Sequence, residues 1–150
     1  MKHRFGFGFL VVVFMLVLAA CSRDGSIAST GTSAGSASSG SQNVQVTLSE
    51  YKVVSSTTTF TVETHYHFVV TNSGKTAHEF MVMQPMAMGN MPMNQMDKMA
   101  LTHIPNINPG ETQTIDYTFP ASSAATSLEF SCHFPGHYEQ GMKLPVTVKK

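Results

Sequence analysis

The sequence has little charge of either sign and no net charge. Lysine plus arginine and aspartate plus glutamate number nine each, and charged residues make up only 12% of the 150 residues. Nothing in this balance would draw nucleic acid or a strongly charged partner to the surface. Nucleic-acid binding is therefore not expected. The chain also lacks tryptophan, whereas it has eleven methionines.

A membrane-spanning run is lacking as well. The N-terminal apolar run, residues 5–20, follows two basic residues and is too short and too interrupted by glycine for a comfortable span, so it predicts a secretory signal. Its end, Leu18-Ala19-Ala20-Cys21, resembles the bacterial lipobox. That resemblance implies a lipoprotein signal peptide at residues 1–20 and a lipid on Cys21. A plain signal peptide or an uncleaved anchor is the alternative, and each would also place the protein outside the cytoplasm.

Cysteine is scarce, and this limits how the exported part can use it. Cys21 and Cys132 are the two cysteines, and lipidation of the first leaves the second without a disulfide partner. Cys132 could be a buried bystander or form an intermolecular disulfide. Its neighbours favour a thiolate that binds a metal.

Residues 21–43 also lack apolar periodicity. After Cys21 they are nearly all serine, glycine, alanine and threonine, which is the composition of a flexible tether. Such a tether has an r.m.s. reach of roughly 25 Å. We therefore expect one folded domain at residues 44–150, held near the envelope membrane and facing the periplasm or the extracellular side.

Short β-type runs follow the tether. Alternating or β-branched segments bounded by turn residues predict strands at Val44–Leu48, Thr58–Val62, His65–Thr71, His78–Val82, Thr112–Phe119, Ser127–Cys132 and Leu144–Val148. About seven short strands in about 105 residues predict an all-β, antiparallel sandwich. The one helix expected is short, around Met93 to Leu101, in a methionine-rich insertion between strands.

The segment with the clearest chemistry runs from Ser131 to Met142. It places a thiol at Cys132, an imidazole five residues later at His137 and a thioether five residues after that at Met142. A thiolate, two imidazoles and a weak axial methionine form the ligand set of a type 1 copper site. The bend at Pro135-Gly136 can turn His137 back toward the same ion, and the second imidazole must come from elsewhere.

This segment resembles the C-terminal copper loop of the blue-copper proteins, or cupredoxins. Residues Val70–Phe80 resemble the strand that carries their first histidine, and the five-and-five spacing is most similar to rusticyanin and sulfocyanin. The resemblance covers about residues 44–150 and implies a Greek-key sandwich with one copper ion. It implies His78, Cys132, His137 and Met142 as ligands. Glu79 departs from the pattern, because many members have there an asparagine that ties the two ligand loops together.

Methionines are clustered upstream of the loop. Eight lie in one segment, at Met81, Met83, Met86, Met88, Met91, Met93, Met96 and Met99. Their spacing fits neither a helix nor a strand, and neutral thioethers can hold Cu(I) without deprotonation, so the segment predicts a secondary Cu(I) site. The alternative, which does not exclude the first, is an adaptable hydrophobic flap that covers the copper site or docks a partner.

Four further histidines can be placed by pattern. His133 follows Cys132 directly and so points to the opposite face, which predicts that it is no ligand of the same ion. His65 and His67 share one face of a strand, and His103 follows the methionine segment. Any of these three could assist a second metal site, although exposed strand or loop residues are the more ordinary interpretation.

Two functions are consistent with these residues. The complete ligand set favours a monomeric, extracytoplasmic one-electron carrier that meets redox proteins at the membrane. The methionine cluster favours a copper chaperone, buffer or resistance protein, whose partners are copper-handling proteins. An enzyme is not expected, because one type 1 site lacks the open coordination position that oxidase or reductase chemistry needs.

Overall fold

The computed structural model describes residues 40–86 and 91–150. The predicted signal peptide, Cys21, most of the tether and Met88 lie outside the described residues. Within them the strands are β1 Gln42–Ser49, β2 Lys52–Ser55, β3 Thr59–Thr61, β4 His65–Asn72, β5 His78–Met83, β6 Thr102–Ile107, β7 Thr112–Thr118, β8 Leu128–Ser131 and β9 Lys143–Lys149. The helical turns are α1 Met93–Met96, η1 Asp97–Met99 and η2 Ala121–Ser123. None of the helices described is long and apolar enough to cross a membrane.

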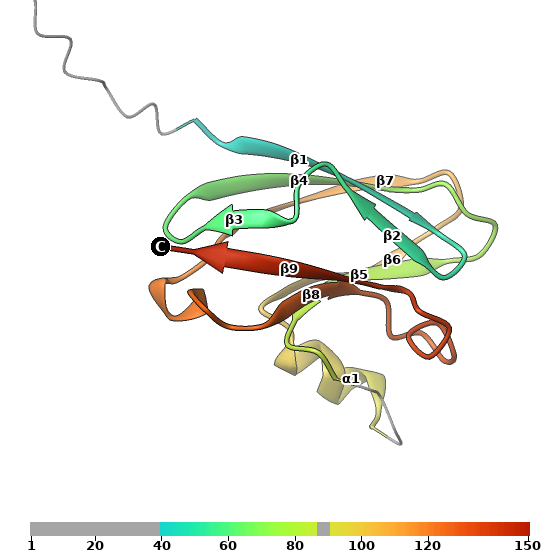
Figure 1. Cartoon of the computed structure of the whole chain (residues 1–150). Helices are drawn as coiled ribbons and strands as arrows, with labels where there is room; N and C mark the ends of the chain where they lie inside the picture. The colour runs from blue at the N-terminus through green and yellow to red at the C-terminus, as the bar shows by residue number, and fades with distance from the viewer. Residues whose placement is uncertain (1–39, 87–90) are drawn as a thin grey trace, which may run out of the picture. The chain divides into compact units, whose positions relative to one another are not determined.

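The strands form two sheets, with the orders β2-β1-β4-β7 and β3-β9-β8-β5-β6 (Figure 1). This confirms the predicted all-β sandwich and its short helical insertion between β5 and β6. The sheets are mixed, however, because β1 pairs with β4 and β3 with β9 in parallel. The chain leaves the first sheet after β2, adds β3 to the second and returns as β4, so β4 runs in the same direction as β1.

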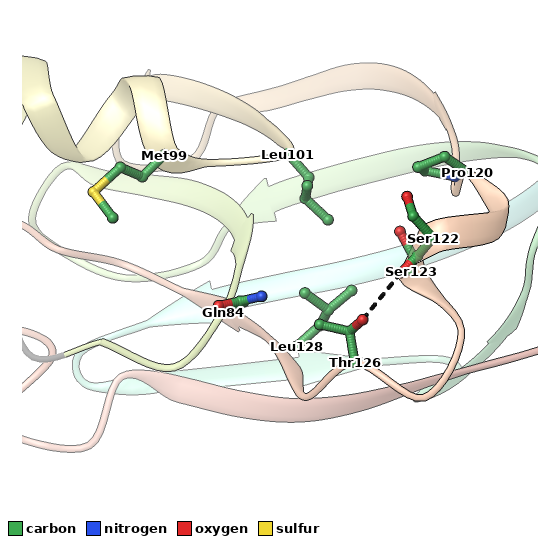
Figure 2. A pocket seen from close by; sticks show the side chains of 8 residues that line it. All are labelled: Gln84, Met99, Leu101, Pro120, Ser122, Ser123, Thr126 and Leu128. Carbon is green, nitrogen blue, oxygen red and sulfur yellow. Dashed lines mark hydrogen bonds between the residues drawn. The ribbon is translucent and has the colours of Figure 1, made fainter.

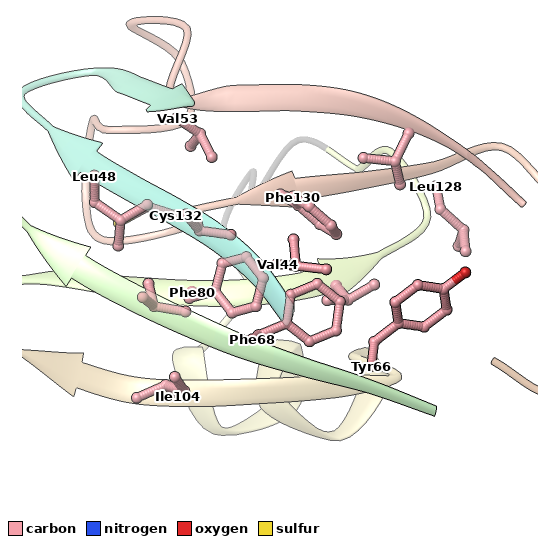
Figure 3. Close-up of a cluster of buried hydrophobic side chains, with 14 of the residues drawn as sticks. Val44, Leu48, Val53, Tyr66, Phe68, Phe80, Ile104, Leu128, Phe130 and Cys132 are labelled. Carbon is pink, nitrogen blue, oxygen red and sulfur yellow. The ribbon is translucent and has the colours of Figure 1, made fainter. Parts of the chain in front are cut away.

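The core lies between the sheets and follows from period-two burial. In β1 the side chains of Val44, Val46 and Leu48 are buried, while the residues between them are exposed. Aromatic rings fill the centre, where Figure 3 shows Phe68, Phe80 and Phe130 in one cluster with Val44 and Leu48 of β1. Strand β5 is buried at all six positions, because it lies between β6 and β8 and both of its faces are covered.

Two strands were not predicted from the sequence. Strand β2 has only four residues and is held by its antiparallel pairing with β1. Strand β6 contains Pro105, which argues against a central strand, but β6 is the edge of its sheet and pairs only with β5. The pairing of β5 with β6 also shifts register between His78 and Phe80. Such a bulge bends the strand that carries the first predicted ligand.

Candidate metal centre

The loop from Cys132 to Met142 joins the paired strands β8 and β9 and closes on itself. The Cys132 N–H donates to the Met142 carbonyl at 3.1 Å, and the Met142 N–H donates to the His137 carbonyl at 3.1 Å. Gly136 and Gly141 have φ angles of 83° and 98°, which side-chain-bearing residues rarely adopt. The turn therefore brings the two sulfur residues together at its base, with His137 folded back over them.

Three predicted ligands converge at this turn. His78 begins β5, next to β8, and its Nδ1 lies 3.2 Å from His137 Nδ1. His137 Nδ1 lies 3.4 Å from Cys132 Sγ. One ligand atom from each of the three residues lies within 4.8 Å of the others. Met142 is fully buried in the same hydrophobic cluster as Cys132.

This donor set fits a copper ion. Two imidazole nitrogens bound to one first-row ion at about 2.0 Å each lie about 3.2–3.5 Å apart at trigonal or tetrahedral angles. The observed separation of 3.2 Å between the two Nδ1 atoms is in that range. A thiol and a thioether add soft sulfur to the two nitrogens, which suits an ion that alternates between Cu(I) and Cu(II). That these residues are copper ligands stays a prediction.

Burial sets the protonation of the metal-free site. It raises the pKa of the Cys132 thiol to about 11, although hydrogen bonds from the N–H groups of Glu79 and Phe134 act to lower this pKa. It also lowers the pKa of His78, with a further contribution from His137. The imidazole of His78 is thus neutral and able to bind a metal, whereas the thiol must lose its proton when a metal binds.

Known structures resemble this sandwich. Auracyanin from Roseiflexus castenholzii matches with a TM-score of 0.55 and 19% identity, over 73% of this chain and 98% of its own. Auracyanin B matches with a TM-score of 0.57 and 20% identity, over 73% of this chain and 89% of its own. An azurin from Methylomonas sp. strain J matches with a TM-score of 0.57 and 17% identity, over 74% of this chain and 100% of its own. The domain has the cupredoxin fold.

A comparison of sequences adds one relative. The copper-resistant cuproprotein CopI of Pseudomonas aeruginosa is 30% identical over 115 residues, which cover 55% of this chain and 62% of that protein. The chain therefore spans less than two thirds of the length of this curated relative. No family model matches the sequence.

The outer nitrogen of His78 faces a carboxylate. His78 is fully buried, and its Nε2 has no hydrogen-bond partner. Glu50 Oε1 lies 4.0 Å from this nitrogen and accepts hydrogen bonds from the N–H groups of Lys75 and Thr76. These hydrogen bonds, the one from Lys75 most of all, lower the pKa of Glu50 to about 2. A Cβ on Gly74 would lie 2.8 Å from Glu50 Oε1 and 3.0 Å from His78 Nε2. The sequence carried no signal for this contact.

Replacing Glu50 with glutamine is expected to raise the reduction potential of the copper-loaded domain. The ionised carboxylate beside His78 favours the more highly charged Cu(II) state, and glutamine removes the charge but keeps an oxygen that can accept the loop N–H groups. Because Glu50 is 37% exposed, the loss in Cu(II) affinity should be up to about tenfold. Potentiometric titration measures the change. Glu63→Gln removes an equal charge elsewhere, and an equal shift in that variant would contradict a specific effect of Glu50.

Glu79 supplies a link between the ligand segments that the sequence left open. The residue is buried, and its Oε1 accepts the N–H of His133 at 2.5 Å, directly after Cys132. Burial raises the pKa of Glu79 to about 7, and the charge of Asp97 adds to the effect. A carboxyl group thus ties β5 to the end of β8. His133 itself is buried, stacks on Tyr138 and bonds to Ser131, outside the converging donors.

The methionine segment divides between core and surface. Met81, Met83 and Met96 are buried together on the face of β5 that points away from the main core, and Met86 and Met91 pack against them. Met99 is 45% exposed, beside a groove of about 220 Å³ that Gln84, Leu101 and Leu128 also line (Figure 2). None of the predicted copper-loop ligands lines this groove. Hydrophobic packing thus accounts for the three buried methionines, and a Cu(I) role for the segment stays a prediction.

A buried carboxyl group lies on the outer face of β8. Glu129 is only 3% exposed, and its Oε1 has no hydrogen-bond partner. Burial raises the pKa of Glu129, while a hydrogen bond from Tyr138 and the charge of Lys143 oppose the shift. Lys143 Nζ also lies 4.1 Å from the centre of the Tyr138 ring. Ionising Glu129 in the folded protein therefore costs free energy.

Glu129 should make the metal-free domain less stable as pH rises. Between the ordinary glutamate pKa and its raised folded value, the folded state keeps a proton that the unfolded state has lost, so the free energy of unfolding falls across that window. Glu129→Gln should make the change in Tm from pH 4 to pH 8 more favourable by roughly a few degrees than in the wild type, because the contributions of Glu79, His78 and the other titrating groups are common to both proteins. Thermal unfolding monitored by circular dichroism measures it.

Glu111→Gln is the control for this pH effect. The Asn108 N–H and the Gln113 amide lower the pKa of Glu111, so its stabilisation is present above the ordinary glutamate pKa and is lost as pH falls. The two variants should therefore change opposite ends of the pH profile. A Glu129→Gln profile parallel to that of the wild type would contradict the prediction.

Proposed function

We propose that the protein is an extracytoplasmic one-electron carrier that binds one copper ion through His78, Cys132, His137 and Met142. The observation that carries this proposal is the convergence of one thiol and two imidazoles within 4.8 Å at the base of a closed loop. The copper ion, when bound, supplies the Cu(I)/Cu(II) couple. The cupredoxin fold and the name of the CopI relative, a copper-resistant cuproprotein, support copper as the metal.

The protein's own part is to hold the donors in place and to provide a route to the surface. Cys132, Met142 and His78 are fully buried in the sandwich, so their positions should change little with oxidation state. His137 is half-buried and has the Tyr51 ring at 5.4 Å and the Phe134 ring at 5.9 Å. We propose that partner redox proteins at the membrane exchange electrons through this exposed edge of His137, with the two aromatic rings limiting the access of water.

Copper handling is the second candidate function. The resistance named for the CopI relative and the thioethers at the surface, such as Met99, support a chaperone, buffer or resistance protein that captures Cu(I). In either case we propose a lipid anchor at Cys21 that holds the protein at the envelope membrane. We propose no catalytic activity for this protein.

A copper titration of the full chain tests the choice. Metal content per chain and visible absorption are recorded in both oxidation states. One copper per chain with a strong, reversible visible band supports electron transfer at a type 1 site. Several Cu(I) ions per chain with a weak or absent band would favour copper handling and overturn the first proposal.

A further inference from the structure

Two imidazoles and a carboxylate meet on the outer face of the other sheet. His65 and His67 alternate on β4 and so share a face, and Asp116 of β7 pairs directly opposite His67. Asp116 Oδ1 lies 2.8 Å from His67 Nδ1 and 3.4 Å from His65 Nε2. Both imidazoles therefore contact the same carboxylate oxygen. The strand pattern predicted that the two histidines share a face, but not their contact with Asp116.

The cluster is open to solvent and has neutral neighbours. The side chains of His65, His67 and Asp116 are 51%, 33% and 56% exposed, so an ion can reach them and the rings can rotate. The cross-strand neighbours are Thr118, opposite His65, and Asn43 of β1, beside His67. Neither carries a positive charge that would compete for the carboxylate. The residue between the histidines, Tyr66, is buried and holds this part of β4 against the core.

We propose that His65, His67 and Asp116 form a second metal site, which takes Cu(II) in preference to Zn(II) or Ni(II). Two nitrogens and one oxygen suit the tetragonal coordination of Cu(II), and Cu(II) binds such sites most tightly among the divalent first-row ions. Rotation of the exposed rings lets an ion take the position between the imidazoles and the carboxylate, and water completes its coordination. The site has no sulfur, so it selects the oxidised ion and does not depend on the copper centre at Cys132.

Copper binding in a background without that centre tests the proposal. In the full chain carrying Cys132→Ser, equilibrium dialysis against Cu(II) and electron paramagnetic resonance should show a bound ion with the spectrum of nitrogen and oxygen ligands. Adding His67→Asn should remove one Cu(II) per chain or weaken its binding at least about tenfold. Asp116→Asn should weaken the same site while both imidazoles remain. Dialysis against Zn(II) and Ni(II) should show weaker binding.

The control is His103→Asn, which removes one imidazole from β6 in the second sheet. It should leave Cu(II) binding by the Cys132→Ser protein unchanged. Equal Cu(II) binding with and without His67→Asn, an equal loss in the His103→Asn variant, or tighter binding of Zn(II) would each overturn the proposal. Because the side chains of His67 and Asp116 are 33% and 56% exposed, circular dichroism should show these variants folded like the Cys132→Ser parent. Failure of the type 1 site would instead appear as a missing visible band in the wild-type protein, so the two proposals fail separately.

Discussion

Cys132→Ser should abolish the visible absorption of the copper-loaded protein and weaken copper binding at this site by more than about 100-fold. The thiol is the one sulfhydryl among the converging donors, and a serine hydroxyl neither ionises readily nor offers soft sulfur to the ion. Visible absorption and metal content, measured in parallel on both proteins, give the result. If the methionine segment binds independently, Cu(I) retention should persist without colour, whereas loss of both would exclude a separate Cu(I) site.

Met142→Leu is the matched control for this result. It removes the thioether from the same loop but leaves the thiol and both imidazoles in place. Because an axial methionine is a weak ligand that mainly tunes the potential, this variant should keep an intense visible band. A Cys132→Ser protein that retained the band would contradict the predicted ligand set.

Phe60→Ala should destabilise the metal-free domain by about 3–5 kcal/mol. The Phe60 ring is fully buried and contacts four other aromatic rings, with centroid distances of 5.0 Å to Tyr66, 5.9 Å to Phe68, 5.2 Å to Phe119 and 5.5 Å to Phe130. Phe60 is the one buried residue of the three-residue strand β3, so the substitution removes the contribution of that strand to the core. Thermal unfolding should show a Tm lower by roughly 12–30 °C, or no folded protein at all.

Two further variants keep this test informative. Phe60→Leu retains most of the apolar volume and should show a smaller loss than the alanine variant. Val54→Ala, on β2, removes a side chain that is 47% exposed and should change the free energy of unfolding by less than about 0.5 kcal/mol. A similar Tm for Phe60→Ala and Val54→Ala would contradict the central packing role of Phe60.

The sequence by itself determined the elements whose signal is local. Alternation in Val44–Leu48 and the β-branched run in His65–Thr71 predicted strands, and β1 and β4 lie there, because burial of one sheet face imposes a period of two. The thiol, imidazole and thioether of the loop lie within eleven residues, so one turn can bring them together. The resemblance of this loop to the cupredoxin copper loop implied the fold, which the structure has, and the ligand set, which stays a prediction.

The tertiary structure alone decided the contacts between distant segments. The parallel pairing of β1 with β4 depends on a crossover through the second sheet, which no local pattern records. The approach of Glu50 to His78 and the hydrogen bond of Glu79 to the His133 N–H join residues that are 28 and 54 positions apart. Asp116 likewise meets His67 only because β7 pairs with β4. Side-chain type restricts what such residues can bind, but the pairing of the strands decides which of them meet.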